Sequence, residues 1–282
     1  MKRLLAIPAA ALATAWSIGC VEVSGPIVDT PDWPFWDNDT TGQVRIEYEW
    51  RGQFGPGEQI EIKGVSGDIR AIPAPANEVV VTATKIGQPG DVANVDIEVV
   101  THDLGTTICA VYPDVPGRQP NECEPGDAAN MTTRDSIGGS VRVEFTVQVP
   151  EGVIFVARTL SGHVEAIGLK SDVFVHTLFG DARVSTTGLA TARTMYGSIV
   201  ASIGQPDWGR DLEFRTLTGD IAVTVPFNAS ADVHATAQFG HITSDFPLSQ
   251  VSPGDMQGKI GAGEWKLTLV TLQGDIRLKR RL

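Results

Sequence analysis

The chain has 282 residues, with 22 Lys or Arg against 34 Asp or Glu, and its formal net charge at pH 7 is −12. This negative charge argues against nucleic acid as a partner, because binding to phosphate backbones requires positive charge. The length allows one large all-β domain, or a sandwich followed by repeats.

The first 19 residues are expected to be a signal peptide. Lys2 and Arg3 precede an apolar stretch over residues 4–18. This stretch is shorter than the roughly 20 residues of a membrane-spanning helix, and it has the length of the apolar core of a signal peptide. The protein is therefore predicted to be exported.

A cysteine at the end of this segment predicts a lipid anchor. Residues 17–20 read Ser-Ile-Gly-Cys and resemble the lipobox of bacterial lipoproteins, although Ser17 stands where that motif usually has leucine. The resemblance implies acylation of Cys20 and attachment to the cell envelope. Val21, in place of an aspartate, implies the outer membrane if the cell has two membranes. A secretory signal with a spare cysteine is the alternative. Residues 20–42 contain three prolines and no periodic pattern, and are expected to form a lipidated tether.

Residues 43–157 are expected to form an antiparallel β region with a disulfide loop. Segments such as VRIEYEW alternate apolar and polar residues, which is typical of strands, and no segment has the period of an amphipathic helix. Cys109 and Cys123 lie in one irregular, proline-rich loop, and two cysteines this close in an exported protein predict a disulfide. A metal or redox pair is the alternative, for which His102 is the nearby support.

Residues 158–282 contain a short repeat. Six segments share a bulky residue, any residue, a glycine, a polar residue and an apolar residue, and a seventh copy, VSGDIRA, begins at Val65. The six segments are LSGHVEA, LFGDARV, MYGSIVA, LTGDIAV, QFGHITS and LQGDIRL. The first five glycines of this run are 17 to 22 residues apart, which is the size of one coil of a β-solenoid. We expect stacked coils of about 17–22 residues with two strands per coil.

The apolar–polar alternation slips by one residue just before each repeat glycine. Val173 and Val175 lie at odd offsets before their glycine, whereas Val164 and Ile276 lie at even offsets after theirs. A bulge or corner produces such a slip, and glycine tolerates the unusual backbone there. The slip places a column of threonines at an inner corner, where hydroxyls can bond the backbone of neighbouring coils. These residues are Thr159, Thr177, Thr194, Thr216 and Thr271. An exposed, ice-binding ladder is the alternative.

The strands that end in Gly-Asp-Ile, together with the terminal run GKIGAGEWKLTLVTLQGDIRL, resemble the bacterial putative-adhesin family of β-solenoid domains of unknown function. The resemblance covers about Gln59 to Leu282 and is best from Arg158 onward. It implies an envelope protein with a repetitive β fold. The insertion that carries Cys109 and Cys123 departs from the simple repeat of the family.

Two sets of outward side chains form a candidate ligand surface. A basic stripe lies four positions before successive glycines: Arg158, His176, Arg193 and Arg215. Phe179 and Tyr196 directly precede their glycines and can stack on sugar rings. Ion pairs between the stripe and acids of adjacent coils, such as Glu213 or Asp181, are the alternative.

A polar residue follows each repeat glycine, as His163, Asp181 and Asp220 illustrate. Stacked at about 4.8 Å, these side chains can form a ladder that binds divalent cations. Hydrogen bonds to local backbone are the alternative, since the multi-glycine repeat of calcium-binding β-rolls is not present in the sequence. Hydrolase, zinc-peptidase and phosphate-loop motifs are also missing from it. We expect no metal, no cofactor and no enzymatic activity.

These patterns predict a lipid-anchored, non-catalytic β-solenoid of the cell envelope that acts as a binding or scaffolding surface. Its expected partners are the membrane, through the anchor, and envelope glycans or envelope proteins. One alternative is a solenoid that binds or acts on envelope polysaccharide. Another is a structural element that assembles through the pairing edges of its end coils.

Overall fold

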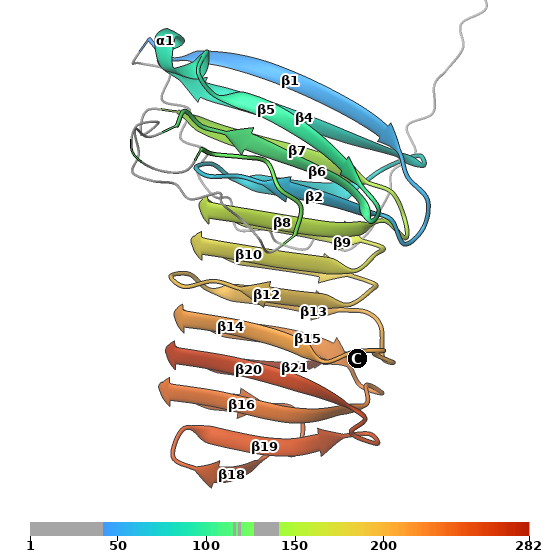
Figure 1. The fold of residues 1–282 in the computed structure, drawn as a ribbon. Helices are drawn as coiled ribbons and strands as arrows, with labels where there is room; N and C mark the ends of the chain where they lie inside the picture. The colour runs from blue at the N-terminus through green and yellow to red at the C-terminus, as the bar shows by residue number, and fades with distance from the viewer. Residues whose placement is uncertain (1–41, 115–116, 118–119, 127–140, 282) are drawn as a thin grey trace, which may run out of the picture. The chain divides into compact units, whose positions relative to one another are not determined.

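The computed structural model describes residues 42–114, 117, 120–126 and 141–281 (Figure 1). The predicted signal peptide, the anchor residue Cys20 and the tether up to residue 41 lie outside the described residues. All described residues fall in one compact unit.

The described residues form 21 strands and one short helix, α1 (Pro89–Val92), and the strands make up two large mixed sheets. In spatial order, the ten-stranded sheet A contains β1 (Val44–Gln53), β4 (Glu78–Gly87), β7 (Arg142–Val149), β3 (Ile69–Pro73), β9 (Val164–Leu169), β11 (Ala182–Thr186), β13 (Ile199–Ile203), β15 (Ile221–Pro226), β21 (Ile276–Arg281) and β17 (Ile242–Ser244). The eleven-stranded sheet B contains β18 (Ser249–Ser252), β19 (Asp255–Ile260), β16 (Ala231–Phe239), β20 (Trp265–Gln273), β14 (Leu212–Thr218), β12 (Ala190–Arg193), β10 (Val173–Phe179), β8 (Ile154–Ser161), β2 (Gln59–Lys63), β6 (Gly105–Val111) and β5 (Asp96–His102). The all-β prediction is confirmed.

From β6 to β17 the strands of sheets B and A alternate along the chain. We call one strand of sheet B plus the following strand of sheet A a layer. Figure 1 shows successive strands of sheet B one below another. In β8/β9, β10/β11, β12/β13 and β14/β15, each layer pairs in parallel with the next. Val173, for example, lies opposite Phe155 in one neighbouring strand and Ala190 in the other.

Two layers lie out of chain order. β20/β21 is inserted between β14/β15 and β16/β17, and it pairs in parallel with both. β2/β3 lies between β6/β7 and β8/β9 in the same way. The N-terminal region is therefore mixed rather than purely antiparallel: β1, β4 and β7 pair antiparallel, but the VSGDIRA copy belongs to a parallel layer.

The core lies between the inward faces of the two sheets. Val173 and Val175 of sheet B and Val164 and Ile276 of sheet A are buried, as the alternation predicts. The slip occurs at the repeat glycines, where the chain passes from sheet B to sheet A. At Gly180 the backbone is left-handed, with φ +151°, and an added Cβ would lie 2.1 Å from the carbonyl oxygen of Gly162 in the next layer. Close layer contact therefore requires glycine at this corner.

The threonine column is an inner structural element, as predicted. Thr177 Oγ1 donates to the Gly162 carbonyl at 3.0 Å, and Thr216 Oγ1 donates to the Gly197 carbonyl at 2.9 Å. These threonines are buried, so their hydroxyls satisfy the corner carbonyls of the adjacent layer.

The predicted disulfide between Cys109 and Cys123 is present, with their Cα atoms 5.6 Å apart. It holds the segment Cys123–Gly126 against the outer face of β2, whose Lys63 and Glu61 are fully buried. Lys63 Nζ donates to the carbonyls of Glu124 and Gly126, and the Gly126 N–H donates to Glu61 Oε2 at 2.9 Å. The segment thus supplies backbone partners to two buried charges.

Candidate functional site

The basic stripe is a column of residues in register on the outer face of sheet B. His176 lies opposite Arg158 in β8 and Arg193 in β12, and Arg193 lies opposite Arg215 in β14. The parallel pairing of four successive layers therefore brings the four residues together. Their surroundings nevertheless differ along the column.

Arg193 and Arg215 share one carboxylate, Glu213. Arg215 Nε donates to Glu213 Oε1 at 2.8 Å, and Arg193 Nη2 donates to Glu213 Oε2. Burial favours the neutral acid, but the hydrogen bonds from both guanidinium groups outweigh this effect and lower the pKa of Glu213. Two cations against one anion leave a single positive charge at this part of the stripe.

Arg158 belongs to the buried charge cluster under the disulfide loop. Its Nε donates to Glu61 Oε1 at 2.7 Å, and Glu61 Oε2 also accepts a hydrogen bond from Thr107 Oγ1 at 2.9 Å. Only 23% of the Arg158 side chain is exposed, whereas the Arg193 side chain is 60% exposed. Arg158 is therefore committed to an internal ion pair, and the accessible end of the stripe is at Arg193 and Arg215.

The two candidate aromatic residues stack on each other. The rings of Phe179 and Tyr196 have centroids 5.2 Å apart and an interplanar angle of 5°. The two residues are 47% and 46% exposed. Each ring covers one face of the other, which leaves at most one face per ring for a ligand.

A column of exposed apolar side chains lies between the stripe and this aromatic pair, and the sequence reasoning missed it. Its members are bulky first residues of the repeat, two positions before the glycine: the exposed Met195, Leu217 and Leu272, and the half-buried Leu178. Met195 is 41% exposed, and Leu217 and Leu272 are each 37% exposed. The signal was available, because this position is out of phase with the buried positions of the same strand. We call this column together with Phe179 and Tyr196 the corner surface.

The polar residues that follow the glycines bond the backbone of the next layer. Asp68 Oδ1 accepts the His163 N–H at 2.7 Å, Asp181 Oδ1 accepts the Ser198 N–H at 2.7 Å, and Asp220 Oδ1 accepts the Asp275 N–H at 2.9 Å. These side chains bond backbone groups as the alternative predicts, but the backbone belongs to the adjacent layer and is not local. Within the described ranges, no group of three or more His, Cys, Asp or Glu residues is placed to hold a metal ion.

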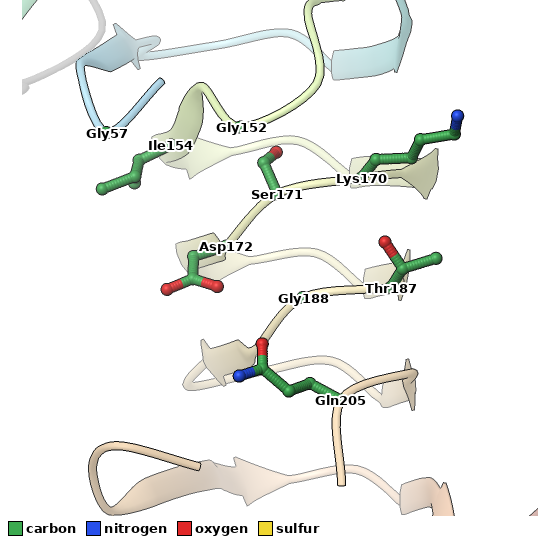
Figure 2. A pocket seen from close by; sticks show the side chains of 9 residues that line it. All are labelled: Gly57, Gly152, Ile154, Lys170, Ser171, Asp172, Thr187, Gly188 and Gln205. Carbon is green, nitrogen blue, oxygen red and sulfur yellow. The ribbon is translucent and has the colours of Figure 1, made fainter. Parts of the chain in front are cut away.

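A shallow groove of about 360 Å³ lies at the opposite corner, along the turns that return from sheet A to sheet B (Figure 2). Lys170, Ser171, Asp172, Thr187 and Gln205 line it, together with glycines of neighbouring turns. Ser171 is only 6% exposed, and its Oγ has no hydrogen-bond partner among the described residues. The sequence carries no signal for a groove in these segments. We call this feature the turn groove.

No helix in the described part of the chain is both long and apolar enough to cross a membrane. Comparisons with family models and with curated proteins give no match. Among solved structures, a cell adhesion protein of Clostridium sporogenes, itself described as putative, matches at 9% identity and a TM-score of 0.45, over 84% of this chain and all of that chain. An adhesin of Bacteroides fragilis, also described as putative, matches at 10% identity and a TM-score of 0.35, over 86% of this chain and 98% of that one.

The chain resembles bacterial putative adhesins. Those names describe the solved proteins, and a likeness this distant assigns no binding partner to this chain.

Proposed function

We propose that this protein is an exported, lipid-anchored and non-catalytic β-solenoid of the cell envelope that binds an external protein partner in the manner of an adhesin. The lipobox-like segment ending at Cys20 supports export and anchoring, with the outer membrane as the site in a cell that has two membranes. The layers support the solenoid, because each contributes one strand to each sheet, turns at a glycine corner and pairs in parallel with its neighbours.

The corner surface is the observation that carries the binding proposal. Exposed Met195, Tyr196 and Phe179 lie beside the accessible Arg193 and Arg215. Aromatic residues, methionine and arginine are the types enriched in the cores of protein interfaces, and contiguous exposed apolar patches on soluble domains mark interaction sites. This composition favours a protein partner, because the surface combines these residue types with an exposed apolar column.

Several side chains with acid–base potential are engaged in the fold, which supports the non-catalytic part of the proposal. Oδ1 atoms of Asp181, Asp220 and Asp275 each accept a backbone N–H from the adjacent layer. Glu61 and Glu213 accept hydrogen bonds from arginines. A general acid or base needs a free atom for proton transfer to the substrate. The hydrogen bonds described above occupy carboxylate oxygens that could otherwise serve this role.

The test is binding of the purified chain to a bacterial envelope preparation, either intact or treated with protease. Met195→Ser combined with Leu217→Ser removes the centre of the apolar column. Val200→Ser, a residue 47% exposed on the outer face of sheet A, is the matched control. We expect binding that is lost after protease treatment and at least tenfold weaker in the double variant, but unchanged in the control. Equal binding by the double variant, or binding that survives protease, would refute the proposal.

A further inference from the structure

We propose that the turn groove is a second binding site, separate from the corner surface, and that its ligand is a linear, uncharged glycan. The groove crosses successive turns of the stack: Gly152, the segment 170–172, the segment 187–188 and Gln205 all line it. In Figure 2 these turns lie one below another, and the Ser171 side chain points toward the turn that holds Gly152. A site that extends over several layers suits an elongated ligand better than a compact one.

The uncharged polar groups that line the turn groove, beside the apolar Ile154, are those that recognise hydroxyls. Ser171 and Thr187 carry hydroxyls, Gln205 carries an amide, and the turns add backbone groups. Each of these side chains can both donate and accept, which matches the dual character of a sugar hydroxyl. An apolar ligand would leave these polar groups unpaired, which is unfavourable.

Charges at the turn groove are already neutralised within the protein. Asp172 Oδ1 accepts the Leu189 N–H at 3.0 Å, and Asp172 Oδ2 accepts a hydrogen bond from Arg210. Lys170 Nζ lies 3.2 Å from a carboxylate oxygen of Glu151. Because Asp172 and Lys170 are both ion-paired, neither offers an unpaired charge that would attract a metal ion or a phosphate. An uncharged ligand therefore suits the groove best.

The Ser171 hydroxyl is buried and lacks a hydrogen-bond partner among the described residues. A buried hydroxyl without a hydrogen bond is unfavourable, and native proteins pair nearly all such groups. The fold bonds the backbone of this residue but not its hydroxyl, since Thr186 Oγ1 donates to the Ser171 carbonyl. A glycan hydroxyl in the groove would provide the partner that the fold does not.

Gly188 keeps this part of the turn groove free of side chains. A Cβ at Gly188 would lie 2.7 Å from the carbonyl carbon of Ser171 and 2.8 Å from Asp172 Oδ1. The turn therefore approaches the preceding layer as closely as the backbone permits. Ser171, which is 6% exposed, and Asp172 line the groove next to this close approach.

The experiment is calorimetric titration of the purified chain with three uncharged hexasaccharides, cellohexaose, chitohexaose and maltohexaose, at low and high salt. We expect at least one to bind, with an affinity that salt does not change. Ser171→Ala should weaken that binding at least tenfold while the melting temperature stays equal or rises, because the hydroxyl has no partner in the fold. A purely structural serine would lower the melting temperature instead.

Two controls separate this site from the corner surface. The Met195→Ser, Leu217→Ser variant should bind the hexasaccharide normally, and a Gln205→Ala variant should bind it more weakly. Binding to none of the three hexasaccharides, undiminished binding by Ser171→Ala, or preferential binding of the acidic oligogalacturonate would each overturn the proposal. Failure of the protein-partner proposal would leave these outcomes unaffected.

Discussion

The corner between sheets B and A depends on two details of the repeat: the missing Cβ of its glycine and the hydroxyl of its threonine. In every repeat the glycine must lack a Cβ, because the next layer's glycine carbonyl occupies that place. Within residues 158–282, a threonine three positions earlier in the chain supplies a hydroxyl to that same carbonyl, as Thr194 does for Gly180 at 3.0 Å. The exception is Gly240, before which Ala237 stands at that position. Steric and hydrogen-bonding requirements thus converge on one backbone group per layer, which explains why the motif recurs with so little variation.

Gly219→Ala should destabilise the fold severely. The new Cβ would lie 2.0 Å from the Gly197 carbonyl oxygen, in a backbone with φ +145°. We expect a loss of about 3 kcal/mol in the free energy of unfolding, from steric clash and backbone strain together. Gly209→Ala is the control, since its Cβ would meet nothing within 4 Å, and it should change stability by less than about 0.5 kcal/mol. Chemical denaturation of both variants checks this, and similar losses would contradict the corner model.

The Glu213 ion pairs should make part of the stability depend on pH. The pKa of Glu213 is lowered in the folded state, so the unfolded chain takes up the proton at higher pH than the native protein does. The contribution is therefore fully present above the ordinary glutamate pKa of about 4.3, and it is lost as pH falls through the lowered folded-state value.

Replacing Glu213 by Gln removes this titration and both charge-assisted hydrogen bonds. We expect the variant to melt at a lower temperature than wild type at pH 7, with a difference that shrinks as pH falls below about 4.3. Salt should reduce the difference as well, because the pairs are partly exposed. Thermal melts from pH 7 to pH 3 measure it. A difference that stays constant over this range would show that the lost contribution is packing rather than charge.

At the scale of elements, the disulfide loop acts as a cover over the outer face of β2. An outward position on a strand is normally exposed, yet Glu61 and Lys63 are fully buried because the segment Cys123–Gly126 lies over them. Buried charges are tolerated only when partners are held in place. The disulfide is the covalent link that keeps these partners near.

Replacing both Cys109 and Cys123 by alanine should cost about 3 kcal/mol, from loop-closure entropy over the short closed loop. It should also uncover Lys63, whose ammonium group is inaccessible in the native protein. Amine-reactive labelling followed by mass spectrometry should then detect Lys63 in the variant and not in wild type. Lys279, which is exposed in both, is the internal reference. Unchanged protection of Lys63 would show that the segment stays in place without the bond.

What the sequence could predict at this scale follows from what periodicity encodes. The two-residue alternation identifies the faces of Val173 and Ile276, and its slip locates the corners, because both are local consequences of backbone geometry. Burial of Lys63 was not predictable, since it depends on a loop about 60 residues away. The turn groove at Ser171 was equally hidden, because it arises from the spacing between turns and not from any motif.

For the whole molecule, the order of the layers is the feature that repeats cannot encode. Each copy of the motif carries the same pairing edges, so the alternation alone does not tell whether β16/β17 or β20/β21 should follow β14/β15. The structure places β20/β21 next to β14/β15, with Leu212 opposite Leu267. β16 then pairs with the far side of β20 and with the antiparallel strand β19. The last strands of the described chain are therefore internal, and the strands before them form the outer layers.

This order predicts an unusual response to truncation. In a stack that follows chain order, every added layer raises stability by its interface with the preceding one. Here a chain that ends at Gly263 lacks β20/β21, so β16–β19 have lost the layer that joins them to β14/β15. We expect this chain to unfold at the same denaturant concentration as a chain that ends at Phe227, because the additional residues contribute no packed layer. Limited proteolysis should cut it soon after Phe227, which is 66% exposed in the complete fold.

The alternative outcome is informative because the repeats are alike. If β16 moved into the place of β20, Val233 would take the position of Leu267 opposite Leu212, and the shortened chain would resist protease and exceed the stability of the chain that ends at Phe227. Adding the peptide 264–282 in trans distinguishes the two situations, since only a chain with an empty β20/β21 position should gain stability from it. Protection gained with the peptide would show that layer order is fixed by side-chain packing within each layer. Protection without the peptide would show that backbone pairing alone determines which layer lies next to β14/β15.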